Sequence, residues 1–362
     1  MSNDIIRSSR SAISTRKSCE MKGYLTYYYS DTGVVPKDFP EKSGEVSMSA
    51  LPKVRGTLFH ELSLAIIQGA TPKDITQLVD DGSKVFPSSI RSEQAALIRR
   101  AMLGWELIRG RWWREHFDVI SAEDAWAWKM SPNVVQPLRM DKLLRRKSDQ
   151  LLGIFDYKTL SSVDPNWPKR MEISDQTNLY IQALKEFSGE WILGMCYDGV
   201  VVGSMKKGVQ RSPFVLGFKK NGIVSAKWTS GCENVDLSTY SDEKWLEWIQ
   251  KQPGTLEELY TTTEFLNPPP SVLLHTKAST ARAEEEFNHR VEIVESIRST
   301  YGEDSGEYSS ILGLIEKNPD QCYKYGVDFA CPFVFQCWHG HRIDPDTFDP
   351  RIDHHAQPSE EE

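Results

Sequence analysis

The chain has 362 residues and a mass of 41.3 kDa, which suffices for one large domain or for two domains of ordinary size. Its hydrophobic content of 39% and its 11 tryptophans exclude a chain that is disordered throughout. The longest apolar runs, such as residues 64–67, are far shorter than the ~20 residues that span a bilayer, and the N-terminus lacks the apolar core of a signal peptide. We therefore expect a cytoplasmic protein with no membrane partner.

The formal net charge of −8 is distributed unevenly along the chain. Residues 343–362 hold seven acidic side chains and three prolines, a composition that predicts a disordered acidic tail. Basic residues are concentrated instead in 1–23 and 139–158. Because binding depends on where charges lie and not on their sum, the acidic net charge does not exclude nucleic acid as a partner.

The first part of the chain, residues 1–118, is predicted to be mainly helical. We expect a helix at 11–29, a loop without periodicity at 31–50, and a second helix that opens near residue 55. Apolar residues then recur at helical spacing from 91 to 117, which predicts a long amphipathic helix.

Beyond residue 118 the pattern changes to that of strands. Segments 119–123, 134–144 and 151–158 are rich in β-formers and are separated by turn sequences, which predicts a β-meander. A helix at 174–187, with Ser174 as its N-cap, and a strand at 191–202 complete a β-β-β-α-β order. This order predicts an α+β fold with a central mixed sheet flanked by helices.

Three further regions complete the predicted organisation. The core extends over 119–260 and ends in a hairpin that turns at Asn221-Gly222. Residues 261–342 form a C-terminal region with a proline linker at 268–270, a charged helix at 279–301 and a group of cysteines. The tail, 343–362, follows it.

The predicted third strand ends in Asp156-Tyr157-Lys158. Residues i and i+2 of a strand project from the same face, so Asp156 and Lys158 lie together while Tyr157 points the other way. A carboxylate beside an ammonium suits metal-assisted attack on a phosphodiester, because the carboxylate holds a hard cation and the lysine offsets charge on phosphorus. A surface salt bridge is the ordinary explanation of such a tripeptide taken alone.

Other residues give Asp156 and Lys158 a functional context. A hairpin brings Asp141 beside Asp156 as a second carboxylate, and His60 lies on a helix that offers an imidazole to the same ion. Gln176 and Tyr180 are four residues apart and so share a helix face, from which they can orient a phosphate or a water molecule. Each of these residues alone is an ordinary charged, packed or amphipathic position.

Together and in this order, these motifs resemble the PD-(D/E)XK nuclease superfamily, in particular its RecB-like branch. The family's Gly-x-x-x-His is similar to Gly56 to His60, its strand-two Asp to Asp141, its Asp-x-Lys to Asp156 and Lys158, and its Gln-x-x-x-Tyr to Gln176 and Tyr180. The resemblance covers about 11–202 and the cysteine segment. It implies a restriction-endonuclease-like core in which His60, Asp141 and Asp156 hold Mg²⁺ or Mn²⁺ and Lys158 positions the attacking water.

The chain departs from the family pattern at one position. The family usually carries Gly three residues before the strand-two Asp, where this chain has Leu138. Glycine there permits tight backbone packing, so its absence weakens the alignment of Asp141 without removing the carboxylate. Asp149 is the competing residue, but it lies in a polar turn and is expected to face solvent. Glu123 occupies a position where many members carry an acid.

The cysteines give a second line of argument. Cys322, Cys331 and Cys337 fall within sixteen residues, and a cytosolic compartment keeps such thiols reduced. In several RecB-like nucleases a 4Fe-4S cluster is held by three downstream cysteines and one upstream cysteine, a position that Cys19 matches. Zinc held by the three cysteines and His339 or His341 is the rival, and unligated buried thiols are the third reading. Cys196 and Cys232 are taken as structural.

Nucleic-acid contacts are predicted for basic residues near the site. Phosphate contact is independent of sequence, which suits an enzyme that degrades DNA. The basic candidates are Arg111, Arg145, Arg146 and Lys147, and the aromatic candidates for base stacking are Trp112, Trp113, Trp126 and Trp128.

The sequence therefore predicts a metal-dependent DNA nuclease. The resemblance implies an exonuclease on single strands or DNA ends, in a bacterial cell or a phage-infected host, with roles in recombination, repair or DNA degradation. One alternative is an iron-sulfur or zinc-stabilised nucleic-acid-binding subunit that does not cut, and another is an RNA-processing enzyme. The residues leave the polarity of cutting, any homo-oligomer and any partner protein open.

Overall fold

The computed structural model describes residues 6–7, 10–31, 33–36, 51–162, 164–206, 209–212, 214–215, 240–251, 259–322, 331–339, 343 and 348–351. The hairpin predicted at Asn221-Gly222, Cys232 and His341 lie outside the described residues. No described helix combines the length and the apolar character that crossing a bilayer requires.

The chain forms two compact units, each built from segments that are distant in sequence. The terminal unit comprises Met1–Phe39, Ala125–Arg139 and Pro270–Glu362, and the sheet unit comprises Pro40–Asp124 and Met140–Pro269. The predicted regions are continuous in sequence, whereas the two units are not. The helices between residues 51 and 116 belong with the core strands, and the segment 125–139 belongs with the two ends of the chain. Pro270 begins the second long segment of the terminal unit, so the proline run falls at a unit boundary as expected.

The sheet unit contains a mixed five-stranded sheet in the order β11-β8-β7-β6-β3. Strand β7 pairs in parallel with β8, and the other neighbours are antiparallel. The strands are β3 (Phe117–Ala122), β6 (Lys142–Arg146), β7 (Leu152–Leu160), β8 (Ile192–Val201) and β11 (Tyr260–Thr262), and a separate ribbon joins β9 (Ser204–Lys206) to β10 (Val209–Arg211). An α+β fold with a mixed sheet is thereby confirmed.

The strand predicted at 134–144 is in fact two strands in different sheets. Strand β5 (Val134–Arg139) pairs with β4 (Ala125–Lys129), and only β6 continues the meander between β3 and β7. The chain leaves the meander at Glu123, whose φ is 58°, and its N–H donates to the carbonyl oxygens of Met140 and Asp141 at 3.1 and 3.2 Å. Apolar residues recur on both sides of this break, so the sequence pattern does not mark it.

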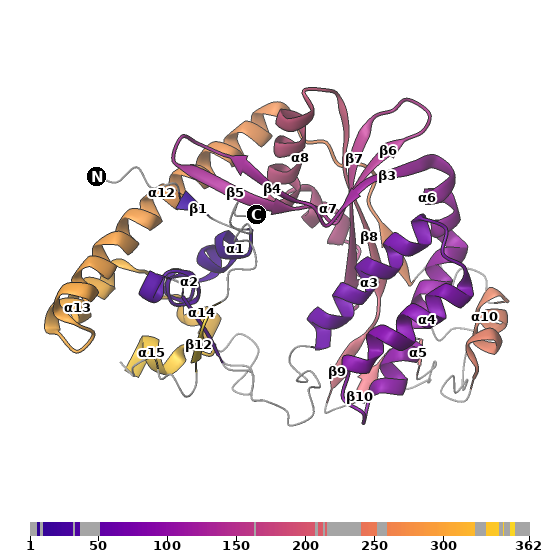
Figure 1. The fold of residues 1–362 in the computed structure, drawn as a ribbon, viewed down its shortest axis with the longest axis horizontal. Coiled ribbons are helices and arrows are strands. Elements are labelled where there is room, and N and C mark those ends of the chain that lie inside the picture. Colours follow the sequence, from indigo (N-terminus) through magenta and orange to yellow (C-terminus); the bar gives the residue numbers. More distant parts are fainter. Residues whose placement is uncertain are drawn as a thin grey trace, which may run out of the picture. The chain divides into compact units, whose positions relative to one another are not determined.

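Helices cover both faces of this sheet (Figure 1). Phe59 of α3 stacks on Tyr157 of β7 at 5.8 Å, whereas α8 packs on the other face, where Gln176 reaches Asp156. On the first side lie α3 (Leu51–Ile67), α4 (Pro72–Gly82), α5 (Arg91–Trp105), a π-helical turn (Glu106–Gly110) and α6 (Arg111–His116), and on the second lie α7 (Trp167–Glu172) and α8 (Asp175–Ser188). The Ser174 side chain accepts from the Thr177 N–H, so the predicted N-cap is confirmed.

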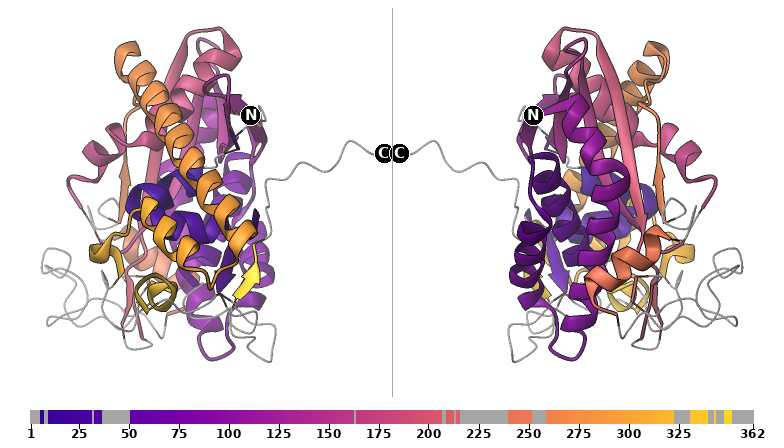
Figure 2. Two further views of the ribbon diagram at one scale, coloured as in Figure 1. Left: turned by 90° about the vertical axis from the view of Figure 1, so that its left-hand side faces the viewer. Right: turned by 90° about the vertical axis from the view of Figure 1, so that its right-hand side faces the viewer.

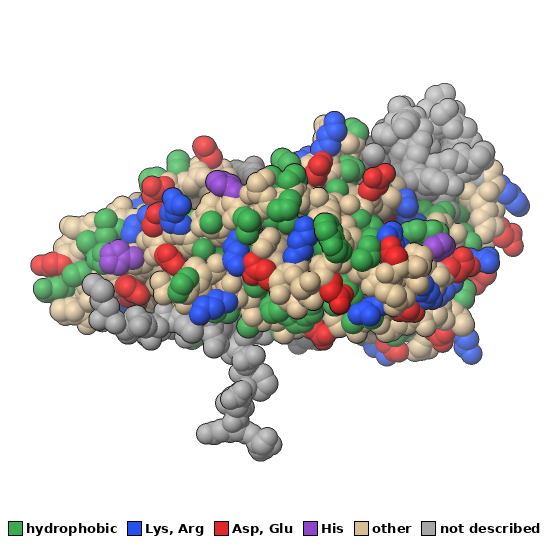
Figure 3. All heavy atoms as spheres, turned by 90° about the horizontal axis from the view of Figure 1, so that it is seen from above, with side chains coloured by type: hydrophobic (Ala, Val, Ile, Leu, Met, Phe, Trp, Pro, Cys, Tyr) green, Lys and Arg blue, Asp and Glu red, His purple; other side chains and the backbone are tan. Residues whose placement is uncertain are grey.

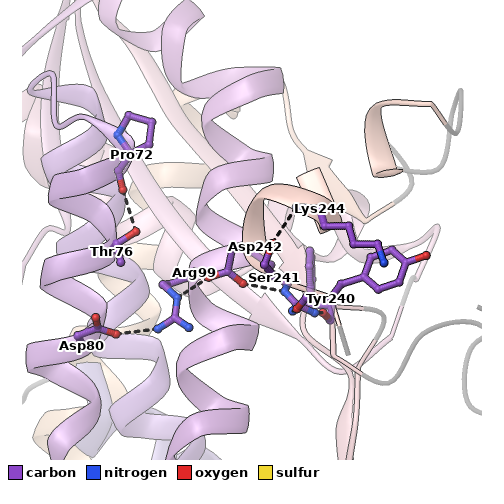
Figure 4. Close-up of polar contacts among 10 residues, drawn as sticks. Pro72, Thr76, Asp80, Arg99, Tyr240, Ser241, Asp242 and Lys244 are labelled. Atoms are coloured by element: carbon purple, nitrogen blue, oxygen red, sulfur yellow. Dashed lines mark hydrogen bonds and ion pairs between the residues drawn. The ribbon is translucent and has the colours of Figure 1, made fainter. Parts of the chain in front are cut away.

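A charged network attaches α10 (Asp242–Gln250) to α5 (Figure 4). Arg99 Nε and Arg100 Nε donate to the two carboxylate oxygens of Asp242 at 2.6 and 2.9 Å. Arg100, which is buried, also donates to the carbonyl oxygens of Phe214 and Tyr240. The Arg100 guanidinium thus bonds both to Phe214 and to Tyr240, which lie on either side of residues 216–239 in the sequence.

The terminal unit is built around a long helix and two small sheets. Helix α12 (Pro270–Tyr301) is continuous in Figure 2, and it begins before the predicted start at 279. The remaining described helices of this unit are α1 (Arg10–Ser18), α2 (Glu20–Tyr27), α13 (Gly306–Ile311), α14 (Pro319–Cys322) and α15 (Val334–His339), with 3-10 turns at Tyr29–Asp31 and Leu312–Leu314. A further 3-10 turn, at Ser83–Val85, belongs to the sheet unit. Cys19 separates α1 from α2, so the helix predicted at 11–29 is broken there.

The two small sheets tie the chain ends to the terminal unit. Strand β1 (Ile6–Arg7) pairs in parallel with β5, and β12 (Phe348–Pro350) pairs with β2 (Val34–Pro36). Phe348 is buried and stacks on Phe333 at 5.3 Å. The prediction of a disordered tail from residue 343 is therefore wrong for this strand, because an apolar side chain inside an acidic segment anchors it. Residues 352–362 lie outside the described part of the chain.

Candidate metal centre

Asp156 and Lys158 of β7 lie together on the face that α8 covers. Lys158 Nζ is 2.6 Å from Asp156 Oδ2, and Gln176 Nε2 of α8 donates to the same oxygen at 3.2 Å. Asp156 is only 1% exposed. Tyr157 points to the opposite face, into the aromatic core with Phe59, as the strand alternation requires.

A second group of ligand atoms lies where the chain leaves and re-enters the sheet. His60 Nδ1 of α3 is 2.7 Å from Asp141 Oδ2, in the short segment before β6. Glu123, directly after β3, completes the group, because ligand atoms of His60, Glu123 and Asp141 all lie within 4.8 Å of one another. Glu123 therefore joins the site through a backbone conformation with positive φ, which is uncommon for a non-glycine residue.

The two groups are electrostatically coupled through the two aspartates. Burial, against the opposing charge of Lys158 and with a further contribution from Asp141, raises the pKa of Asp156 to about 8. Burial also lowers the pKa of Lys158, but Asp156 and Asp141 outweigh that effect and raise the pKa above its usual value. Two carboxylates this close need a proton or a cation between them, because the ionised pair is otherwise repulsive.

The residues at this site fit a hard divalent cation. His60 Nδ1, Asp141 Oδ2 and Asp156 Oδ1 are buried atoms without a hydrogen-bond partner among the described residues, and the 2.7 Å His60–Asp141 contact lacks hydrogen-bond geometry. Burial lowers the pKa of His60 to about 4, so the imidazole is neutral at neutral pH, as a metal ligand must be. Carboxylate oxygens and an imidazole are suitable ligands for Mg²⁺ or Mn²⁺.

Tyr180 and Lys142 complete the immediate surroundings. Tyr180 lies one turn after Gln176 on α8, is buried, and contributes to the raised pKa of Lys158. Lys142, which sequence reasoning missed, is 1% exposed, and its Nζ lies 5.2 Å from the Phe155 ring centroid. Burial lowers the pKa of Lys142 to about 8, against the attraction of Asp141, Asp156 and Glu123. The sequence signal that could have identified Lys142 is a lysine directly after Asp141, at a position of the strand where an apolar residue is expected to point inward.

The predicted DNA-contacting basic residues lie on α6, on β6 and in the turn that follows it. Three of them are paired with acids: Arg111 with Glu115, Arg146 with Asp149, and Lys147 with Asp118. Asp149 is exposed in the turn, as expected of the competing residue. The face in Figure 3 likewise has Lys and Arg interspersed with Asp and Glu. Such exposed pairs contribute little stability and exchange readily for phosphate, but they do not form a strongly positive surface.

The four tryptophans considered for base stacking differ in exposure. Trp112 is 47% exposed, whereas Trp113 and Trp128 are buried and Trp126 is half-buried. Trp128 packs beneath Lys277 of α12, in the terminal unit. Trp112 is therefore the stacking candidate that remains.

Four cysteines line one cavity of about 140 Å³ in the terminal unit. Cys19 comes from the break between α1 and α2, Cys322 from α14, and Cys331 and Cys337 from the segment around α15. The Cys331 N–H donates to the Cys322 carbonyl at 2.7 Å, and burial raises the pKa of Cys337 to about 12. The upstream cysteine thus meets the three downstream cysteines, while the side chains of His339 and His341 lie outside the description.

The sequence matches none of the protein-family models searched, and a search of the curated proteins finds no match. The functional argument therefore depends on the geometry of this chain.

Proposed function

We propose that this protein is a divalent-metal-dependent DNA nuclease whose sheet unit is a restriction-endonuclease-like core. The observation that carries the proposal is the convergence of His60, Asp141, Asp156 and Lys158 from a helix, a strand break and one strand. A half-buried group of two coupled carboxylates with a neutral imidazole and a lysine has the composition that phosphodiester hydrolysis requires.

In this proposal the residues divide the work between binding and positioning. His60, Asp141, Asp156 and Glu123 hold Mg²⁺ or Mn²⁺, which when bound supplies Lewis acidity to the scissile phosphate and acidifies a water molecule. Lys158 keeps its proton, because Asp156 lies 2.6 Å away, and it donates to the attacking water or a phosphoryl oxygen. Gln176 fixes the Asp156 carboxylate from α8, and Tyr180 closes the side near Lys158.

DNA with free ends or single strands is the proposed substrate, through the resemblance to the RecB-like branch. Arg111, Arg146 and Lys147 exchange their acidic partners for phosphates as the strand binds, and Arg145 is proposed to contact the strand as well. The four cysteines in their common cavity are proposed to hold a 4Fe-4S cluster, with zinc as the alternative.

Digestion of labelled substrates tests the activity and its requirement for ends together. End-labelled linear, circular single-stranded and circular duplex DNA, with an RNA of the same sequence, are incubated with Mg²⁺ or Mn²⁺ and with EDTA. We expect metal-dependent release of short products from linear DNA and none with EDTA. Binding without cleavage under every condition identifies the non-cutting subunit instead, and preferential RNA cleavage identifies an RNA-processing enzyme.

A further inference from the structure

A second cavity, of about 490 Å³, opens in the sheet unit on the face opposite to Asp156. It lies between the π-helical turn and α6 on one side and β8 and the segment after β11 on the other, as its lining residues show. Cys196 and Asp198 of β8 are register partners of Phe155 and Tyr157, so they belong to the face that carries the aromatic core. The volume falls within the range of small-ligand pockets.

Aromatic side chains form part of the wall of this cavity. Trp112, Trp113 and Phe265 line it, and the Phe265 ring lies 5.7 Å from Phe117 and 6.2 Å from Trp113. A Cβ on Gly153 would lie 2.6 Å from Phe265 Cε1, so Gly153 permits the close approach of this ring to β7. Fixed rings of this kind provide a surface for a planar aromatic ligand.

An arginine in the lining is held by a buried carboxylate. Arg109 Nε lies 3.6 Å from Asp198 Oδ1, and Asp198 Oδ2 accepts from Trp105 Nε1 at 2.9 Å. Asp198 is 0% exposed, and its Oδ1 has no hydrogen-bond partner among the described residues. Although burial raises the pKa of Asp198 to about 6, the group is ionised at neutral pH and attracts Arg109. The Arg109 side chain, which is 30% exposed, is therefore oriented before any ligand arrives.

The π-helical turn brings Arg109 to this position. Such turns occur frequently at functional sites, because one added residue redirects the side chains that follow. Gly110 is the last residue of the turn. A Cβ at this position would lie 2.1 Å from Glu106 Oε2 and 2.6 Å from Ile66 Cγ2, so a larger residue does not fit there. The Glu106 carboxylate is itself held by Arg114, so the space at Gly110 cannot be enlarged by moving Glu106.

We propose that this cavity binds a guanine base against its aromatic side chains, with Arg109 donating to O6 and N7 and Glu264 accepting from N1–H and the 2-amino group. Glu264 lines the cavity and is exposed, so its carboxylate is available. Among the bases, guanine alone presents an acceptor pair to an arginine and a donor pair to a carboxylate, whereas adenine carries an amino group in place of O6. The base can come from a free nucleotide or from a single strand.

This inference goes beyond the proposed nuclease function and stands independently of it. Calorimetry is performed in EDTA with the Asp156→Asn variant, so that binding is measured without hydrolysis. We expect dGMP to bind at least about tenfold more tightly than dAMP, dCMP or dTMP, a factor that corresponds to about 1.4 kcal/mol. Equal binding of all four nucleotides, or binding of none of them and of no guanine-containing strand, would overturn the proposal.

Matched variants locate the binding, and an oligonucleotide identifies its source. Glu264→Gln should abolish the preference for guanine and Trp112→Ala should weaken binding about tenfold, while Glu190→Gln, at an exposed glutamate outside the cavity, should change neither. A thymidine 12-mer with one internal guanine should bind more tightly than dGMP if the base comes from a strand, and no more tightly if it comes from a free nucleotide. A Glu264→Gln variant that still prefers guanine would contradict the assignment. Because binding is measured without hydrolysis, a failure to detect nuclease activity in the digestion experiment would not affect it.

Discussion

The candidate metal centre of the sheet unit and the cysteine cavity of the terminal unit both collect side chains from distant parts of the chain, but with different chemistry. The first gathers oxygen and nitrogen atoms whose charges are coupled, so that burial raises the pKa of Asp156 to about 8. The second gathers four free thiols around about 140 Å³. In the proposed function the sheet unit carries the reaction, and a metal bound by the four cysteines would join segments from the two ends of the chain.

The largest expected effect is the loss of DNA cleavage when the candidate metal centre is changed. Asp156→Asn should reduce DNA cleavage more than about 10³-fold, because the neutral amide neither binds the cation as a carboxylate does nor holds Lys158. Initial rates on end-labelled DNA in Mg²⁺ provide the measurement. Asp149→Asn, at an exposed turn aspartate paired with Arg146, is the matched control and should retain activity. Full activity in Asp156→Asn would remove the assignment.

The same variant has a predicted effect on stability that depends on pH. Because burial raises the pKa of Asp156 above its ordinary value of 3.8, the unfolded chain loses this proton first, and the metal-free protein becomes less stable as the pH rises from 4 to 8. Asp156→Asn lacks this titration, so it should gain about 1–3 kcal/mol over the natural chain between pH 5 and pH 8. Urea unfolding in EDTA measures the difference, and parallel pH profiles would contradict the account.

The next effect belongs to the cysteine cavity. Cys331→Ser should lose the bound metal and lower the melting temperature by several degrees, because three remaining thiolates leave a cluster with one open position. Iron and zinc analysis, absorbance near 400 nm and thermal unfolding of anaerobically purified protein provide the readouts. Cys196→Ser, which changes a buried cysteine of the sheet unit, is the control and should keep the full metal content. Unchanged metal content in Cys331→Ser would show that the thiols are unligated.

A third effect concerns the stability of the sheet unit and leaves the candidate metal centre unchanged. Arg100→Met leaves the Phe214 carbonyl without its charged donor and removes one of two arginines from Asp242, so it should cost about 2–3 kcal/mol in the free energy of unfolding. Lys84→Met, which removes an exposed ion pair with Asp81, should cost less than about 1 kcal/mol. Equal losses would mean that the network of Figure 4 contributes no more than a surface pair.

The smallest predicted effect concerns Lys142. Its ammonium lies near the acids that are proposed to bind the cation, so Lys142→Met should bind Mn²⁺ about three to ten times more tightly at pH 7. Burial lowers the pKa of Lys142 to about 8, and the gain should therefore shrink at pH 9, where the natural side chain is neutral. Calorimetric titration at both pH values measures it. An affinity that is unchanged at pH 7 would show that Lys142 does not sense the site.

The sequence predicted local features of the site better than its long-range features. Asp156 and Lys158 project together because strand alternation is a local rule, and Ser174 caps α8 through a contact three residues away. The break before Asp141 was missed, because β5 and β6 follow each other with β-forming residues although they belong to different sheets. The burial of Lys142 depends on packing from three strands, which a single sequence pattern does not report.

The proposed nuclease function requires that His60, Asp141 and Asp156 share one cation. Anomalous diffraction at the manganese edge, from crystals of the full chain grown with Mn²⁺, tests it most directly. We expect one strong peak about 2.0–2.3 Å from ligand atoms of these three residues, with Lys158 beside it. A manganese ion bound elsewhere, with the imidazole and the two carboxylates left without metal, would contradict the claim.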